Sequence, residues 1–167
     1  MEIIINDTNI LLDLIKLDLL DHFFTLDADL RTVDFVVNEI SDPNQQKILS
    51  PFIESGKLFV KNFSSEEIEG IFDLQLQCRG NLSITDVSVI FYAKNLQNCR
   101  ILTGDKQMKN KAQQLGIKVN GILFVFDLLL HSKILSPPEA IEKLQELKRI
   151  NRRLPHSEIE KLINNWS

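Results

Sequence analysis

The sequence predicts an α/β fold in which a parallel β-sheet lies between two layers of helices. Three observations support this three-layer α/β/α class. Short apolar, β-branched runs alternate with longer segments of helical periodicity. The runs are apolar at most positions, which is typical of strands that are covered on both faces. The segments between them are long enough for the helical crossovers that connect parallel strands.

Five strands are expected. The first contains three consecutive isoleucines, and the second is interrupted by Asp34. The apolar runs that predict them are, in chain order, 3–6, 33–37, 58–61, 100–103 and 117–119.

The helices between these strands are indicated by apolar spacing and by capping signals at their ends. Asp42 followed by Pro43 predicts a helix start, and Ser64 with Glu67 forms a capping box. Gly56 and Gly116 mark helix ends. The expected helices cover about 10–20, 43–54, 64–79, 83–97, 106–115 and 121–131.

The end of the chain is expected to be entirely helical. Cap signatures begin at Ser136 and at Ser157. A chain of 167 residues is close to the usual size of one domain. We therefore expect an α/β domain over residues 1–150 and a helical extension over 151–167 that packs on or beside it.

Composition narrows the classes of protein. The net charge of −4 argues against an extended basic surface. If four of the 23 acidic residues bind a metal, however, the remaining 19 balance the 19 basic residues. No apolar run is long enough to span a membrane, and the N-terminus has no signal-peptide pattern. Cys78 and Cys99 are not at metal-binding spacing and are interpreted as reduced thiols. A cytoplasmic protein without a membrane segment is expected.

Four acidic residues are expected at one edge of the sheet. Asp7 directly follows the first predicted strand, Glu39 lies two residues beyond the second, and Asp105 lies two beyond the fourth. Asp86 lies in the first turn of a predicted helix. The carboxyl ends of parallel strands share one edge, where ligands bind in open α/β sheets.

Clustered carboxylates repel one another unless a cation neutralises them, and oxygen ligands without Cys or His favour Mg²⁺ or Mn²⁺. Such a site can activate water for attack on a phosphodiester. Each acid also has a purely structural interpretation. Asp7 and Asp105 can cap the helices that follow them, Asp86 can complete a capping box with Ser83, and Glu39 can be a solvated acid.

Polar neighbours extend the candidate site. Thr8, Asn9 and Thr103 are positioned to orient the carboxylates, and Lys106 and Lys109 follow Asp105 and are candidates for binding substrate phosphates. A separate basic cluster near the C-terminus is a candidate for binding RNA or an acidic partner, or is a solvated helix end. Its members are Lys148, Arg149, Arg152 and Arg153.

Together these residues resemble the PIN-domain family. Asp7-Thr8-Asn9 after an isoleucine-rich strand is similar to the opening of PIN domains, and Glu39, Asp86 and Asp105 follow in the family's order. The resemblance covers nearly the whole chain. Its C-terminal part is similar to prokaryotic PIN proteins related to the toxins of toxin–antitoxin modules.

The resemblance implies the strand order 3-2-1-4-5 and a Mg²⁺- or Mn²⁺-dependent endoribonuclease, in which Asp7, Glu39, Asp86 and Asp105 bind the metal and act in catalysis. It also implies products with 5′-phosphate and 3′-hydroxyl ends, frequent homodimers and, in toxin members, inhibition by a small antitoxin protein. The alternative is a PIN-like scaffold that acts through protein partners with little or no nuclease activity.

Overall fold

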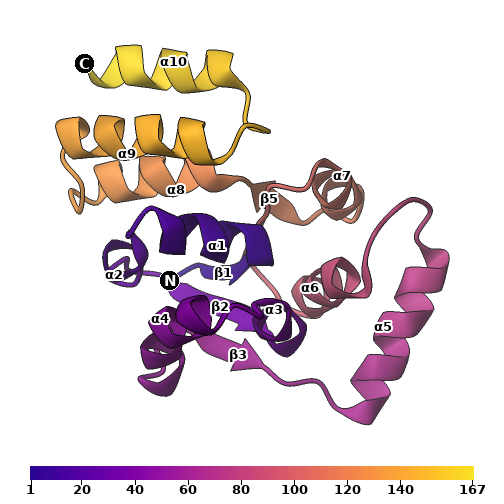
Figure 1. The fold of residues 1–167 in the computed structure, drawn as a ribbon. Helices are drawn as coiled ribbons and strands as arrows, with labels where there is room; N and C mark the ends of the chain where they lie inside the picture. Colours follow the sequence, from indigo (N-terminus) through magenta and orange to yellow (C-terminus); the bar gives the residue numbers. More distant parts are fainter.

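The central sheet has five parallel strands in the order β3-β2-β1-β4-β5, in a computed structural model that describes residues 1–167 (Figure 1). This confirms the predicted fold class and strand order. The strands are β1 (Ile3–Asn6), β2 (Asp29–Val33), β3 (Phe59–Lys61), β4 (Cys99–Leu102) and β5 (Lys118–Asn120).

β1 is the centre of the sheet and pairs with β2 on one side and β4 on the other. Ile5 is level with Arg31 of β2 and with Ile101 of β4. Ile4, Ile5 and Asn6 are all buried. The chain leaves β1 toward β2 and later returns to β4, so the carboxyl end of β1 is the point where the strand order reverses.

The second strand lies earlier than predicted, because 34–39 is a helix. β2 contains polar residues, but their polar groups are satisfied: Arg31 forms an ion pair with Asp29 at 2.7 Å, and the Thr32 hydroxyl donates to the Asn6 carbonyl at 2.7 Å. Asp34 accepts a hydrogen bond from the Phe35 N–H at 2.8 Å and begins the helix. The expectation that Glu39 lies two residues beyond the second strand is therefore wrong.

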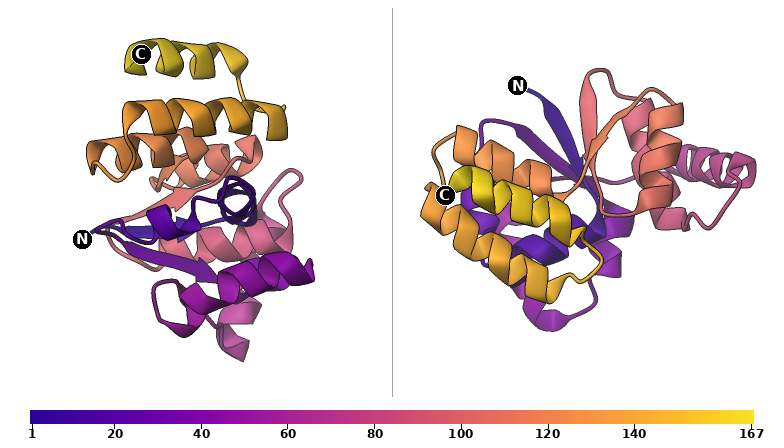
Figure 2. Two further views of the ribbon diagram at one scale, coloured as in Figure 1. Left: turned by 60° about the vertical axis from the view of Figure 1, so that its left-hand side comes forward. Right: turned by 90° about the horizontal axis from the view of Figure 1, so that it is seen from above.

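Ten helices surround the sheet (Figures 1 and 2). The first group, which packs together through α1, is α1 (Thr8–Lys16), α2 (Leu20–Phe23), α3 (Asp34–Glu39) and α4 (Pro43–Glu54). The second group comprises α5 (Ser65–Gln77), α6 (Ile84–Lys94) and α7 (Lys106–Gln114), with α6 on β2 and β4 and α7 on β5. The chain ends in α8 (Ile122–His131), α9 (Pro137–Ile150) and α10 (His156–Trp166).

Most predicted caps are confirmed. Asp42 caps α4, and complete capping boxes begin α5 at Ser64, α6 at Ser83 and α9 at Ser136. Two predictions are wrong. The helix expected over 10–20 is divided into α1 and α2 because Asp18 has a φ of 55°, in the left-handed region. The last helix starts at His156 without a side-chain cap, so Ser157 is inside it.

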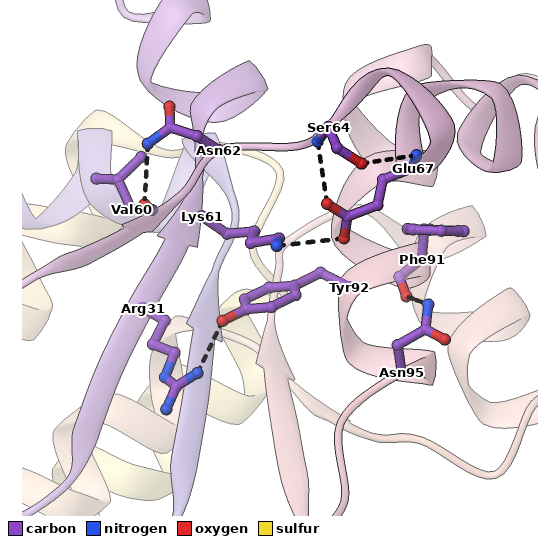
Figure 3. A network of polar contacts seen from close by, with 9 residues as sticks. All are labelled: Arg31, Val60, Lys61, Asn62, Ser64, Glu67, Phe91, Tyr92 and Asn95. Atoms are coloured by element: carbon purple, nitrogen blue, oxygen red, sulfur yellow. Dashed lines mark hydrogen bonds and ion pairs between the residues drawn. The ribbon is translucent and has the colours of Figure 1, made fainter.

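A polar network fixes α5 and α6 against the sheet (Figure 3). The Arg31 guanidinium of β2 donates to the Tyr92 hydroxyl of α6 at 2.8 Å. Lys61 at the end of β3 pairs with Glu67 of α5 at 3.2 Å, and Glu67 also closes the α5 capping box. These contacts hold the last turn of α6 beside β2 and the start of α5 beside the end of β3.

The three C-terminal helices are layered on the α2 side of the domain (Figure 2). The Lys143 ammonium of α9 donates to the Leu17 carbonyl at 2.7 Å. Ile159 of α10 is fully buried, and the Trp166 ring stacks on Phe126 of α8 with 6.4 Å between centroids. The boundary expected between residues 150 and 151 stays a prediction. None of the helices combines the length and apolar character needed to cross a membrane.

Candidate metal and active site

The four predicted acids lie on four different elements at the carboxyl edge of the sheet. Asp7 directly follows β1 and caps α1, and Asp105 caps α7 after β4. Asp86 lies in the first turn of α6. Glu39 is the last residue of α3 and reaches the same edge through a contact with Thr8.

Asp7 is the buried centre of this group. Its side chain is held from two directions, because Oδ1 accepts from the Thr8 N–H at 2.8 Å and Oδ2 accepts from the Thr103 hydroxyl at 2.7 Å. Only 3% of the residue is exposed. Its own N–H donates to the Leu102 carbonyl at 2.9 Å, which ties it to β4. The position of the carboxylate is therefore fixed by β1, α1 and β4 together.

The electrostatics of Asp7 are those of an anion without a counter-ion. Its pKa is raised to about 6, first by burial and then by the charges of Asp86 and Glu39, against the two hydrogen bonds that lower it. The pKa of Asp86 is also raised, first by burial and then by the charges of Asp105 and Glu39. No Lys or Arg forms an ion pair with any of the four acids. The cluster thus has a deficit of positive charge.

Two threonines connect the acids. The Thr8 hydroxyl donates to Glu39 Oε2 at 2.7 Å. The Thr103 hydroxyl donates to Asp7 and accepts from the Asp105 N–H at 3.1 Å. Thr8 therefore contacts Glu39 and Thr103 contacts Asp7 and Asp105, and their expected orienting role stays a prediction.

The expectation that Asn9 orients Asp7 or a metal-bound water stays a prediction, and Asn9 also has a contact that was not expected. Its Oδ1 accepts from the Gly104 N–H at 2.9 Å and fixes the turn between β4 and α7. Asn9 therefore positions the segment that carries Asp105.

The structural roles of the acids are present as well. Asp105 Oδ1 caps α7 by accepting from the Met108 N–H at 2.8 Å, and Asp86 Oδ2 accepts from the Ser83 N–H at 3.1 Å. These bonds occupy one oxygen of each carboxylate. The second oxygen of Asp86, of Asp105 and of Glu39 has no hydrogen bond in the chain and is available to a ligand.

The donor set fits a hard divalent cation. All of the donors are carboxylate oxygens, which Mg²⁺ and Mn²⁺ prefer, and Asp7 is a buried anion that a cation would stabilise. No three acidic, His or Cys side chains converge closely enough to ligate one ion together. This spacing suits Mg²⁺, which is usually held by one or two carboxylates and keeps several waters.

Sequence reasoning missed part of the wall of this site. A hollow of about 280 Å³ beside Glu39 is lined by Phe35, Asn38 and Thr85. Asn38 directly precedes Glu39, and Thr85 directly precedes Asp86. This adjacency in the sequence is the signal that could have identified both residues as part of the site. A larger hollow, of about 970 Å³, is lined by residues of α8, the following turn, the start of α9 and the end of α10, and includes none of the four acids.

The two candidate lysines take different positions. Lys106 is exposed at the first position of α7. Lys109 is half-buried over the start of α8, where a Cβ at Gly121 would lie 3.0 Å from its Nζ. Neither forms an ion pair, so both charges are uncompensated within the chain.

Fold and site together define a doubly wound α/β domain with four acids at its topological switch point. The family model described as "DUF3368: PIN domain" matches residues 3–167. The chain belongs to the PIN-domain family, which is generally a nuclease fold.

Among solved structures, the chain is similar to a PilT N-terminus domain protein from the hyperthermophilic archaeon Sulfolobus solfataricus P2. The two are 20% identical with a TM-score of 0.47, over 78% of this chain and 94% of that one. None of the curated proteins matches the chain.

Proposed function

We propose that this PIN domain is a metal-dependent endoribonuclease that hydrolyses RNA phosphodiester bonds with Mg²⁺ or Mn²⁺. The observation that carries the proposal is the buried Asp7 carboxylate, which has no Lys or Arg partner in the chain and lies near the charges of Glu39 and Asp86. RNA as the substrate rests on the family, since PIN-domain nucleases act on RNA.

Asp7, Glu39, Asp86 and Asp105 would hold the ion directly or through its bound waters. When bound, the ion supplies an activated water and stabilises the charge that develops on the phosphate. The chain's own contribution is positioning. Thr103 fixes Asp7 relative to the Asp105 backbone, and Thr8 restrains Glu39. Burial of Asp7 makes its ionised form costly without a cation, which favours cation binding.

The exposed Lys106 ammonium is positioned to attract substrate phosphate to this edge. It follows Asp105 directly and has no acidic partner in the chain. Lys109, half-buried over Gly121, contributes positive charge on the β5 side of Asp105. Cleavage within an RNA strand would leave 5′-phosphate and 3′-hydroxyl ends, as in the family.

The test is cleavage of an end-labelled single-stranded RNA with Mn²⁺ by the wild type, Asp105→Asn and Asp42→Asn. Asp42 is the matched control, because it caps α4 as Asp105 caps α7 but is exposed outside the cluster. We expect Asp105→Asn to lower the rate by about a hundredfold or more and Asp42→Asn to leave it unchanged. Equal rates for all three proteins would refute the assignment.

A second candidate function is protein binding through α5. Phe72 and Leu76 on this helix are 52% and 86% exposed, which is unusual for large apolar side chains and is typical of an interface. The occupant proposed is a second copy of the chain, which gives the expected homodimer.

Light scattering tests this candidate. The wild type is expected to be a dimer, and the pair of substitutions Phe72→Ser and Leu76→Ser is expected to give a monomer of unchanged fold. A monomeric wild type that forms a stoichiometric complex with a small co-expressed protein would instead favour an antitoxin at this surface.

A further inference from the structure

A groove runs from the acid cluster to the connection between α9 and α10. It has a volume of about 260 Å³. Asp105 and Asn9 lie at one side of it, Lys16 of α1 lies along it, and Arg153 lines it from the connection. Figure 1 shows that this connection lies on the same side of the molecule as the starts of α1 and α7. The groove is therefore continuous with the proposed active site.

The connection is held in place by specific contacts. Asn151 Nδ2 donates to Asp13 Oδ2 of α1 at 3.2 Å, and Asn151 Oδ1 accepts from the Arg153 N–H at 3.2 Å. Asp13 is only 7% exposed. With α9 bound to Leu17 and α10 packed through Ile159, the backbone of Arg153 has a defined place beside α1.

Two exposed cations of the groove are suited to a polyanion, although the carboxylates of Asp13 and Asp105 also line it. The side chains of Arg153 and Lys16 are exposed and form no ion pair in the chain, although its net charge is −4. Of the other cations of the C-terminal cluster, Lys148 is paired with Glu160, and Arg149 is exposed away from the groove. Arg152 is exposed but does not line the groove.

The lining also limits what the groove can recognise. It contains no aromatic ring on which a base could stack, and its remaining walls are aliphatic side chains such as Ile10, Ile122 and Leu154. It is smaller than the pockets that enclose whole small molecules. A backbone phosphate with its sugar suits such a groove, and binding would be tolerant of sequence and sensitive to salt.

We propose that the α9–α10 connection is a substrate-binding arm, in which Arg153 with Lys16 binds a backbone phosphate of the RNA strand outside the scissile bond. This inference rests on the proposed nuclease function. It gives the C-terminal helices a role in holding the substrate next to Asp105.

The test is fluorescence anisotropy of a short, mixed-sequence, single-stranded RNA in EDTA, which prevents cleavage and separates binding from hydrolysis. At about 50 mM salt we expect Arg153→Gln to weaken binding about fivefold and to lower the slope of log K against log salt by about 0.7. Arg153→Lys should keep that slope, because it keeps the charge. Arg152→Gln is the matched control and should keep both the affinity and the slope.

Three results of the binding assay would overturn the inference: equal binding by Arg153→Gln and Arg152→Gln, no binding by the wild type at low salt, or polyglutamate binding as tight as RNA and equally dependent on Arg153. The last result would assign the groove to an acidic protein segment. Arg153-dependent RNA binding without Mn²⁺-dependent cleavage would support the arm and refute the nuclease. Cleavage that is indifferent to Arg153 would refute the arm alone.

Discussion

Replacing Asp7 with Asn is expected to stabilise the metal-free protein while removing its metal site. Burial raises the Asp7 pKa from 3.8 to about 6. The folded state therefore binds this proton more tightly than the unfolded state, and stability falls as the pH rises from about 4 to about 6. At about 1.4 kcal/mol per pKa unit, the ionised carboxylate costs about 3 kcal/mol at neutral pH.

The amide recovers most but not all of this cost. The amide oxygen of Asn can still accept from the Thr8 N–H. The amide NH₂ group, however, faces the Thr103 hydroxyl, which in the wild type donates to the Asp7 carboxylate. Rearranging that contact costs about 1 kcal/mol. The net gain is about 2 kcal/mol, which for a domain of this size raises the Tm by about 4 to 8 °C.

The assay is thermal and urea unfolding in EDTA at about pH 7.5 and about pH 4, for the wild type, Asp7→Asn and the exposed Asp42→Asn. The gain should appear only for Asp7→Asn and disappear at the lower pH, where the wild-type carboxyl is protonated. Saturating Mn²⁺ should reverse the order, because only the wild type gains binding free energy. Two results would contradict this prediction: Asp7→Asn less stable than the wild type in EDTA at neutral pH, or a gain in its unfolding free energy that persists at about pH 4.

Three further substitutions test the connections around the site. Thr103→Val removes the donor to Asp7 and should lower the unfolding free energy by about 1 to 3 kcal/mol in urea titrations, and an unchanged midpoint would contradict its role. Thr8→Val releases Glu39 and should weaken Mn²⁺ binding about tenfold by calorimetry with little change in Tm, whereas unchanged affinity would count against the link. Asn151→Ala leaves a buried carboxylate of α1 without its donor and should cost about 1 to 2 kcal/mol, and a neutral result would show that this contact does not fix the connection.

The sequence allowed much of the fold to be predicted where local signals and tertiary packing agree. Ile4 and Ile5 of β1 are buried as expected, and the serines that start α5, α6 and α9 form the capping boxes that their spacing indicates. Asp7 and Asp105 are placed correctly because each follows a strand of high apolar content. Thr103 lies beside both acids and contacts each of them, and its orienting role stays a prediction.

Prediction failed where tertiary contacts override local preference. Arg31 lies in β2 because Asp29 and Tyr92 satisfy its guanidinium, a partnership that a window of sequence does not show. Val36 and Val37 favour a strand by residue type but belong to α3. The position of Glu39 relative to its strand was wrong for this reason. The groove at Arg153 depends on the packing of helices distant in sequence, and the basic cluster alone did not distinguish Arg153 from Arg152.

The most direct test of the central claim is a Mn²⁺ titration monitored by the electron paramagnetic resonance signal of the free ion, for the wild type and Asp7→Asn. The account predicts saturable binding by the wild type at neutral pH and its loss in Asp7→Asn, which keeps the fold by circular dichroism. Wild-type protein that binds no Mn²⁺, or Asp7→Asn that binds it equally well, would contradict a cation site at the carboxyl end of β1.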